Sequence, residues 1–378
     1  MPPVLIVCRL ISLWLLLAVA AGCSSTSKPR SSRERALTTI VLPEPLIVAP
    51  PTQLPPAAIV AEAMEEPPPQ ITPAMTPAGR LWPSDWQSAW VPLESWGKFN
   101  GFSKPVQLSA GQEPLYQIQS SNGLVLVKIG SQTINFGGMQ YGLGFAPRLF
   151  KGLPYIHSLD ARKTLQALVE ALFIPPTTNR TIVIDAGHGG RDSGALNSIG
   201  HDNEKVFTLD WALRLAPLLR SKGWNVVMTR TNDSALSLGD RVSVAERVHA
   251  DLFLSLHFNS GVPNRELSGV ETYCLTPTGL PSNLIREFED DSSQSHPNNA
   301  FDDQNVQLAS RLHRAILQAT GAVDRGVRRA RFMAVLRRQN RPAVLLEGGY
   351  LSNPDEARRI ASPEYRQTIA EAVARALE

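Results

Sequence analysis

The sequence is poor in the features that mark several classes of protein. Three cysteines among 378 residues allow at most one disulfide, which excludes a disulfide-stapled scaffold. The 37 Lys and Arg residues nearly balance the 34 Asp and Glu residues, and a net charge of +3 argues against a dedicated nucleic-acid binder. A hydrophobic share of 43% excludes a wholly disordered chain. The sequence is therefore expected to contain folded domains and to have no nucleic-acid partner.

Glycine and aromatic residues are absent from residues 24–78, which contain 12 of the 30 prolines. A segment of this composition is poorly suited to packing a core. Proline favours an extended polyproline II conformation that rises about 3.1 Å per residue, so the segment could reach on the order of 170 Å. We therefore predict a disordered tether over residues 24–78. A partly collapsed linker without a specific reach is the alternative.

An apolar run at residues 10–21 precedes this tether and follows Arg9. Such a run is too short to span a bilayer as a helix and is typical of a secretory signal core. It ends in the sequence VAAGC at residues 19–23, which resembles the lipobox of bacterial lipoproteins. The resemblance implies a signal peptide over residues 1–23 and lipidation of Cys23, and Ser24 then favours a periplasmic-side anchor in the outer membrane. Ordinary signal cleavage is the alternative.

Residues 79–172 differ from the tether because aromatic residues return, with four tryptophans between residues 82 and 96. Alternating apolar runs at residues 115–119, 124–129 and 133–136 are separated by glycines and predict short strands. Leucines at helical spacing predict a helix over residues 159–172. We therefore expect a small β-rich accessory domain. Its tryptophans either pack the core, which is the preferred interpretation, or stack on sugar rings.

Residues 176–378 show a strand–helix alternation that predicts an α/β domain, with a mixed or parallel sheet flanked by helices. Apolar β-branched runs predict buried strands at residues 181–184, 252–256 and 343–346. A polar residue follows each strand, and one more lies in the first turn of an amphipathic helix. Because ligand sites in such sheets form beyond the carboxyl ends of strands, these residues are expected to share one crevice. They are His188, His257, Glu347 and the helix-start residue Glu204.

Two histidines and one carboxylate form the ligand set of hydrolytic zinc sites, which leave a fourth position open for water. A second carboxylate is what such a site needs as a general base. Each residue also has a structural interpretation. A strand-end histidine can be a packing residue, a helix-start glutamate can complement the helix dipole, and a buried glutamate can be ion-paired. Spacing alone does not decide between these interpretations.

Six stretches in a fixed order carry a family resemblance: 185–195 (DAGHGGRDSGA), 203–205 (NEK), 229–230 (TR), 250–259 (ADLFLSLHFN), 269–273 (GVETY) and 342–353 (PAVLLEGGYLSN). Together they resemble the zinc-dependent N-acetylmuramoyl-L-alanine amidases of the amidase-3 family, over about residues 179–378. The resemblance implies that His188, Glu204 and His257 bind Zn²⁺ and that Glu347 is the catalytic base. It also implies cleavage of peptidoglycan at the amide between the lactyl group of muramic acid and L-Ala.

The chain departs from the family beside the implied ligands. Phe258 stands where the family usually has alanine, and Gly348 where it often has threonine. These departures affect substrate detail more than the reaction. The expected substrate contacts are His201, Asn259 and Arg230.

Two further questions stay open at this point. The arginine-rich residues 325–341 either line a groove for the carboxylates of the stem peptide or form a solvated face, which is the preferred interpretation. The protein could also be a non-catalytic cell-wall binding protein, or a zinc peptidase that cuts within the stem peptide. Any protein activator is unknown.

Overall fold

The computed structural model describes residues 75–76, 78–83, 86, 88–121, 123–170, 180–200, 202–284 and 290–378. The predicted signal peptide with Cys23, nearly all of the predicted tether, and His201 lie outside these ranges. In the described part of the chain, no helix combines the length and apolar character needed to cross a bilayer.

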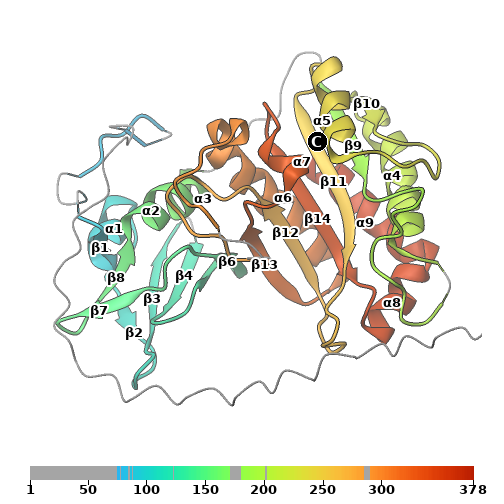
Figure 1. The fold of residues 1–378 in the computed structure, drawn as a ribbon. Helices are drawn as coiled ribbons and strands as arrows, with labels where there is room; N and C mark the ends of the chain where they lie inside the picture. The colour runs from blue at the N-terminus through green and yellow to red at the C-terminus, as the bar shows by residue number, and fades with distance from the viewer. Residues whose placement is uncertain are drawn as a thin grey trace, which may run out of the picture. The chain divides into compact units, whose positions relative to one another are not determined.

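The described residues form a mixed sheet of eleven strands in the order β10-β9-β11-β14-β12-β13-β6-β5-β4-β3-β2 (Figure 1). Strands β9, β10, β11 and β14 are parallel, whereas β12 runs antiparallel to β14 and parallel to β13. The predicted mixed sheet is therefore confirmed. The strands are β2 (Val106–Gln107), β3 (Leu115–Ser120), β4 (Gly123–Lys128), β5 (Thr133–Phe136), β6 (Met139–Gly142), β9 (Thr181–Ala186), β10 (Asn225–Met228), β11 (Leu252–Asn259), β12 (Val270–Cys274), β13 (Asp324–Arg329) and β14 (Ala343–Tyr350).

Helices cover both faces of the C-terminal part of this sheet, because its central strands are apolar on both sides. Alternate residues of β11 enter two separate cores. Leu254 and Leu256 pack in the core that includes residues of α4, α6 and α9, whereas Phe253 packs in the core that includes residues of α5 and α7. The helices are α4 (Glu204–Ser221), α5 (Leu238–Arg247), α6 (Asp302–Thr320), α7 (Ala334–Arg337), α8 (Pro354–Ala361) and α9 (Pro363–Ala376).

The accessory segment continues the same sheet. Strands β2 to β6 form an antiparallel meander, and β6 pairs with β13 through Tyr141 and Val327. Across this seam, Asn283 donates a hydrogen bond to the carbonyl oxygen of Leu143, and Asp324 accepts one from the N–H of Gln140. The sequence pattern does not predict this continuity, because strand pairing between distant segments leaves no local signal.

A second, three-stranded sheet completes the accessory segment. It has the order β1-β8-β7 and is followed by short helical turns that include α2 (Ser158–Asp160) and α3 (Gln166–Glu170). Trp86 and Trp96 are fully buried, so these two tryptophans pack the core, as the preferred interpretation predicts. The remaining elements are β1 (Trp90–Pro92), α1 (Leu93–Phe99), β7 (Arg148–Phe150) and β8 (Leu153–His157).

Candidate metal centre

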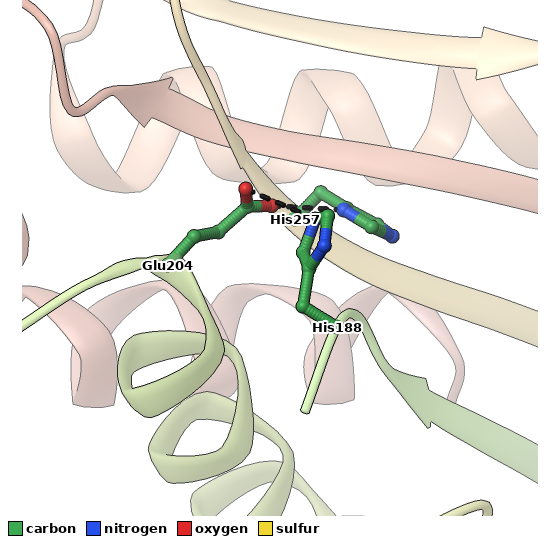
Figure 2. Close-up of side chains that lie close together, drawn as sticks. All are labelled: His188, Glu204 and His257. Carbon is green, nitrogen blue, oxygen red and sulfur yellow. Dashed lines mark hydrogen bonds and ion pairs between the residues drawn. The ribbon is translucent and has the colours of Figure 1, made fainter. Parts of the chain in front are cut away.

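Three of the predicted site residues converge at the carboxyl edge of β9 and β11 (Figure 2). His188 follows β9, Glu204 is the first residue of α4, and His257 lies in β11. The Oε2 atom of Glu204 is 3.0 Å from Nε2 of His188, and its Oε1 atom is 2.8 Å from Nδ1 of His257. One ligand atom from each residue can be chosen so that all three lie within 4.8 Å of one another.

The backbone around these residues is shaped for close approach. A Cβ atom on Gly187 would lie 2.3 Å from the His257 ring, and one on Gly194 would lie 2.5 Å from Oε2 of Glu204. His188 itself has a φ of 60°, a left-handed conformation that is uncommon for residues other than glycine. Strained conformations of this kind persist where the surrounding structure enforces them. The motif glycines therefore leave the space in which the two imidazoles and the carboxylate meet.

Asp192 orients the first histidine, and the sequence analysis did not single it out. Its Oδ2 atom lies 2.8 Å from Nδ1 of His188, and its Oδ1 atom accepts a hydrogen bond from the Gly194 N–H. Histidines that bind metals commonly donate their second ring N–H to a carboxylate, which fixes the ring and its tautomer. The sequence signal that could have identified Asp192 is its place in the same motif, four residues after His188.

A buried polar network supports the site from below. The fully buried Asp185 accepts hydrogen bonds from Ser255 and Arg241, and Arg241 also donates to the carbonyl oxygen of His188. Arg230 belongs to this network, since it donates to the carbonyl oxygens of Ala186, Gly187 and Lys205 and is only 3% exposed. The prediction that Arg230 contacts substrate is therefore corrected. Its guanidinium is used to hold the backbone beneath the site.

The carboxyl group of Glu204 is held ionised. Its burial alone would raise its pKa, but the hydrogen bonds and charges of His188 and His257 outweigh burial and keep that pKa below the usual range. The backbone N–H groups of Ala195 and Phe258 donate to the same carboxylate, at 2.8 and 3.0 Å. An ionised oxygen ligand beside two imidazole nitrogens is a donor set that suits a divalent transition metal. The three residues therefore fit a metal ion.

Glu347 lies in the same cleft as these three residues. The cleft has a volume of about 600 Å³, within the range of ligand sites, and Asn259 also lines it. Glu347 is half-buried and is paired in register with His257, so their backbones lie about 4.8 Å apart across the sheet. The predicted strands stop short of these residues, whereas β11 and β14 continue through them. Both side chains therefore project from strands and not from loops.

Phe258 and Gly348, the two departures beside the site, contact each other. Phe258 is buried, and its ring packs on Trp211 with the ring centroids 5.4 Å apart. A Cβ atom on Gly348 would lie 2.8 Å from Cε1 of Phe258 and 3.1 Å from Cζ3 of Trp211. The large residue at 258 and the missing side chain at 348 therefore form one size-complementary pair behind the site.

This pair predicts a non-additive effect on stability. We expect Gly348→Ala to lower the free energy of unfolding by about 1–3 kcal/mol, because the added methyl overpacks the core. Phe258→Ala alone should cost about 3–5 kcal/mol through the cavity it leaves. The double variant should lose less free energy of unfolding than the sum of the two single losses, as measured by denaturant unfolding. Gly239→Ala is the control, since nothing but Ser237 lies near its added Cβ; simple additivity would contradict the pairing.

Residues 182–378, more than half of the chain, match the family profile described as N-acetylmuramoyl-L-alanine amidase. The chain is 34% identical over 205 residues to the probable cell wall amidase LytH of Staphylococcus epidermidis, covering 54% of this chain and 59% of LytH. It is 30% identical over 216 residues to the N-acetylmuramoyl-L-alanine amidase AmiA of Escherichia coli, covering 52% of this chain and 74% of AmiA.

A solved structure is also similar. The catalytic domain of the amidase CwlV from Bacillus (Paenibacillus) polymyxa is 33% identical, with a TM-score of 0.43, and the match covers 52% of this chain and 95% of that domain. The match to the family profile includes the residues that line the cleft. The chain therefore belongs to the amidase-3 family of N-acetylmuramoyl-L-alanine amidases.

Proposed function

We propose that this protein is a zinc-dependent peptidoglycan amidase that cleaves the amide between the lactyl group of muramic acid and L-Ala of the stem peptide. One observation carries the proposal. The ligand atoms of His188, Glu204 and His257 lie within 4.8 Å of one another, in the cleft that also contains Glu347. Membership of an amidase family supports an amide as the bond that is cleaved.

The proposed roles of the residues are supported by their positions in the cleft. His188, Glu204 and His257 would hold Zn²⁺, and Asp192 would keep the His188 ring in place. A bound zinc ion supplies a Lewis acid that polarises the scissile carbonyl and makes water a better nucleophile near neutral pH. Glu347 accepts a proton from the attacking water and delivers it to the amine nitrogen of L-Ala as the C–N bond breaks. The products are a lactyl carboxylate on the glycan and a free stem peptide.

Product masses test this proposal. The zinc-loaded full-length protein should release complete stem peptides with a free L-Ala amine from purified peptidoglycan, and a chelator should lower the rate at least a hundredfold until zinc is restored. Chelator already saturated with zinc is the control. Shortened stems still attached to the glycan would instead identify a zinc peptidase. Binding of peptidoglycan without any product would identify a non-catalytic wall protein.

We also infer how the chain is organised and where it acts. A signal peptide at residues 1–23 would give a lipid anchor at Cys23, residues 24–78 would form the tether, residues 79–172 the accessory domain and residues 176–378 the catalytic domain. The composition of the first two segments supports an envelope protein anchored on the periplasmic side, in the outer membrane. The mass of the mature N-terminal peptide tests this inference, since an unmodified cysteine or an intact signal would contradict it.

A further inference from the structure

A break in strand register brings two arginines onto one face of the sheet. Val270 of β12 pairs with Asp324 of β13, but Thr272 pairs with Val327, so β13 contains one extra residue, a β-bulge. Gly326 lies in this bulge with a φ of 95°, a conformation that favours glycine. Residues three apart in a regular strand face opposite sides. The extra residue therefore explains how two arginines three positions apart can meet on one side.

Arg325 and Arg328 converge on a single carboxylate oxygen. Nε of Arg325 and Nη1 of Arg328 donate to Oε1 of Glu271, at 3.1 and 2.8 Å. The other oxygen of Glu271 accepts hydrogen bonds from Asn259 and Tyr273, and Glu271 is almost completely buried. One buried carboxylate thus faces two guanidinium groups, and the next carboxylate along this face is Glu347, which is paired in register with Glu271.

The acidic residue of β13, Asp324, does not lie on the face of the sheet that carries Arg328. The Oδ1 atom of Asp324 lies 2.9 Å from Nε2 of His313, on helix α6. Asp324 pairs in register with Val270, whereas Arg328 pairs with Tyr273, and these two β12 residues face opposite sides. Arg328 keeps 31% of its side chain exposed, and its remaining guanidinium nitrogens have no hydrogen-bond partner among the described residues.

The two arginines line a polar pocket at the seam with the accessory segment. Its volume is about 70 Å³, several times what one water molecule needs, and its other walls include Gln132, Thr133 and Gln140. The strands that build it, β13, β6 and β5, follow one another across the sheet, and Figure 1 shows β6 beside β13. A pocket of this size with an arginine at its wall suits a carboxylate or a similar small anion.

The pocket is connected to the metal cleft through Glu271. Asn259 lines the cleft and donates to Glu271, which in turn is paired in register with Glu347. Strand β13 lies two strands from β14, a separation of about 10 Å. An extended peptide covers at most about 3.5 Å per residue, so this separation corresponds to roughly three residues.

We propose that Arg328 and Arg325, together with the polar edge of the accessory strands, bind a carboxylate of the stem peptide about three residues from the scissile amide. This inference rests on the proposed function and adds a role for the accessory segment, which would complete the substrate groove. It also revises the preferred interpretation of the arginine-rich stretch. Arg329, Arg331 and Arg341 are buried, and Arg325 and Arg328 line a pocket, so five of the seven arginines in residues 325–341 do not belong to a solvated face.

Paired substrates test the site in the zinc-loaded full-length protein. One is a muropeptide with free stem carboxylates, and the other has those carboxylates converted to carboxamides. For Arg328→Gln we expect KM to rise about tenfold or more with the free carboxylates, the effect of losing a charged hydrogen bond. The KM for the amidated substrate and both kcat values should change less than about twofold. Arg358→Gln, an exposed arginine of α8, is the matched control.

A second pair of variants tests the accessory side of the pocket. Thr133→Val and Gln140→Leu should raise KM for the free carboxylates only. The proposal is overturned if Arg328→Gln leaves KM unchanged for both substrates. It is also overturned if the substitution raises KM equally for both substrates and lowers kcat, which is the result expected of a folding defect.

Failure of the proposed function gives a different result, because the unsubstituted protein then cleaves neither substrate. Calorimetry with the free stem peptide does not depend on turnover and still reports on the site. Weaker binding by Arg328→Gln than by the unsubstituted protein supports the carboxylate site. Equal binding by the two proteins overturns it.

Discussion

Glu347→Gln is expected to lower kcat at least a hundredfold and to leave the bound metal in place. A general base typically contributes a factor of about 10² to 10⁴ to the rate, and an amide cannot accept the proton from water. Glu347 shares the cleft with His188, Glu204 and His257 but is not one of the three side chains whose donor atoms cluster. Turnover of peptidoglycan and zinc content by mass spectrometry measure the two effects separately.

The control for this prediction is Glu371→Gln, the same substitution at an exposed position of α9. It should leave both turnover and zinc content unchanged. Loss of zinc from Glu347→Gln would show that Glu347 is a ligand and would overturn its assignment as the base. Retained turnover would show that another group accepts the proton.

Glu204→Gln should remove both the metal and the activity. The substitution keeps the shape of the side chain but replaces a carboxylate that contacts both His188 and His257. The backbone N–H groups that now donate to this carboxylate would face an amide, one end of which is itself a donor. We expect the affinity for zinc, measured by competition with a chelator, to fall by more than a hundredfold.

Asp192→Asn provides a graded comparison. Asp192 contacts His188 but contributes no ligand atom to the three-residue cluster, and losses at such outer positions typically reach ten- to hundredfold in affinity. The expected order of zinc affinity is therefore unsubstituted protein, Asp192→Asn, then Glu204→Gln. If the Glu204→Gln variant binds zinc normally but is inactive, Glu204 acts as the base and Glu347 becomes the candidate ligand. Circular dichroism checks that both variants are folded.

Local sequence patterns were sufficient to predict the strands that position the site residues. The apolar runs at residues 181–184, 252–256 and 343–346 became the central strands β9, β11 and β14. Buried strands and amphipathic helices leave a periodic signal within a few residues, which makes them readable from one sequence. The convergence of His188, Glu204 and His257 followed from the rule that strands of a parallel sheet end at a common edge.

Features that depend on pairing between distant segments were not readable. The extension of β11 and β14 through His257 and Glu347 results from the register between these strands. Arg230 carries the same charge as a substrate-binding arginine, and only its burial beneath the site shows that it supports the backbone. The register shift that unites Arg325 and Arg328 is likewise invisible in the spacing of the two residues.

The sequence by itself determined the family, the order of the central strands and helices along the chain, and the three side chains that could hold a metal ion. These depend on local periodicity and on short motifs whose residues lie close together in the sequence. The tertiary structure alone decided that the accessory strands join the sheet of the C-terminal segment, that Asp192 orients His188, and that Phe258 fills the space left by Gly348. Each of these depends on which distant atoms become neighbours, and that is set by packing and strand register across the whole fold.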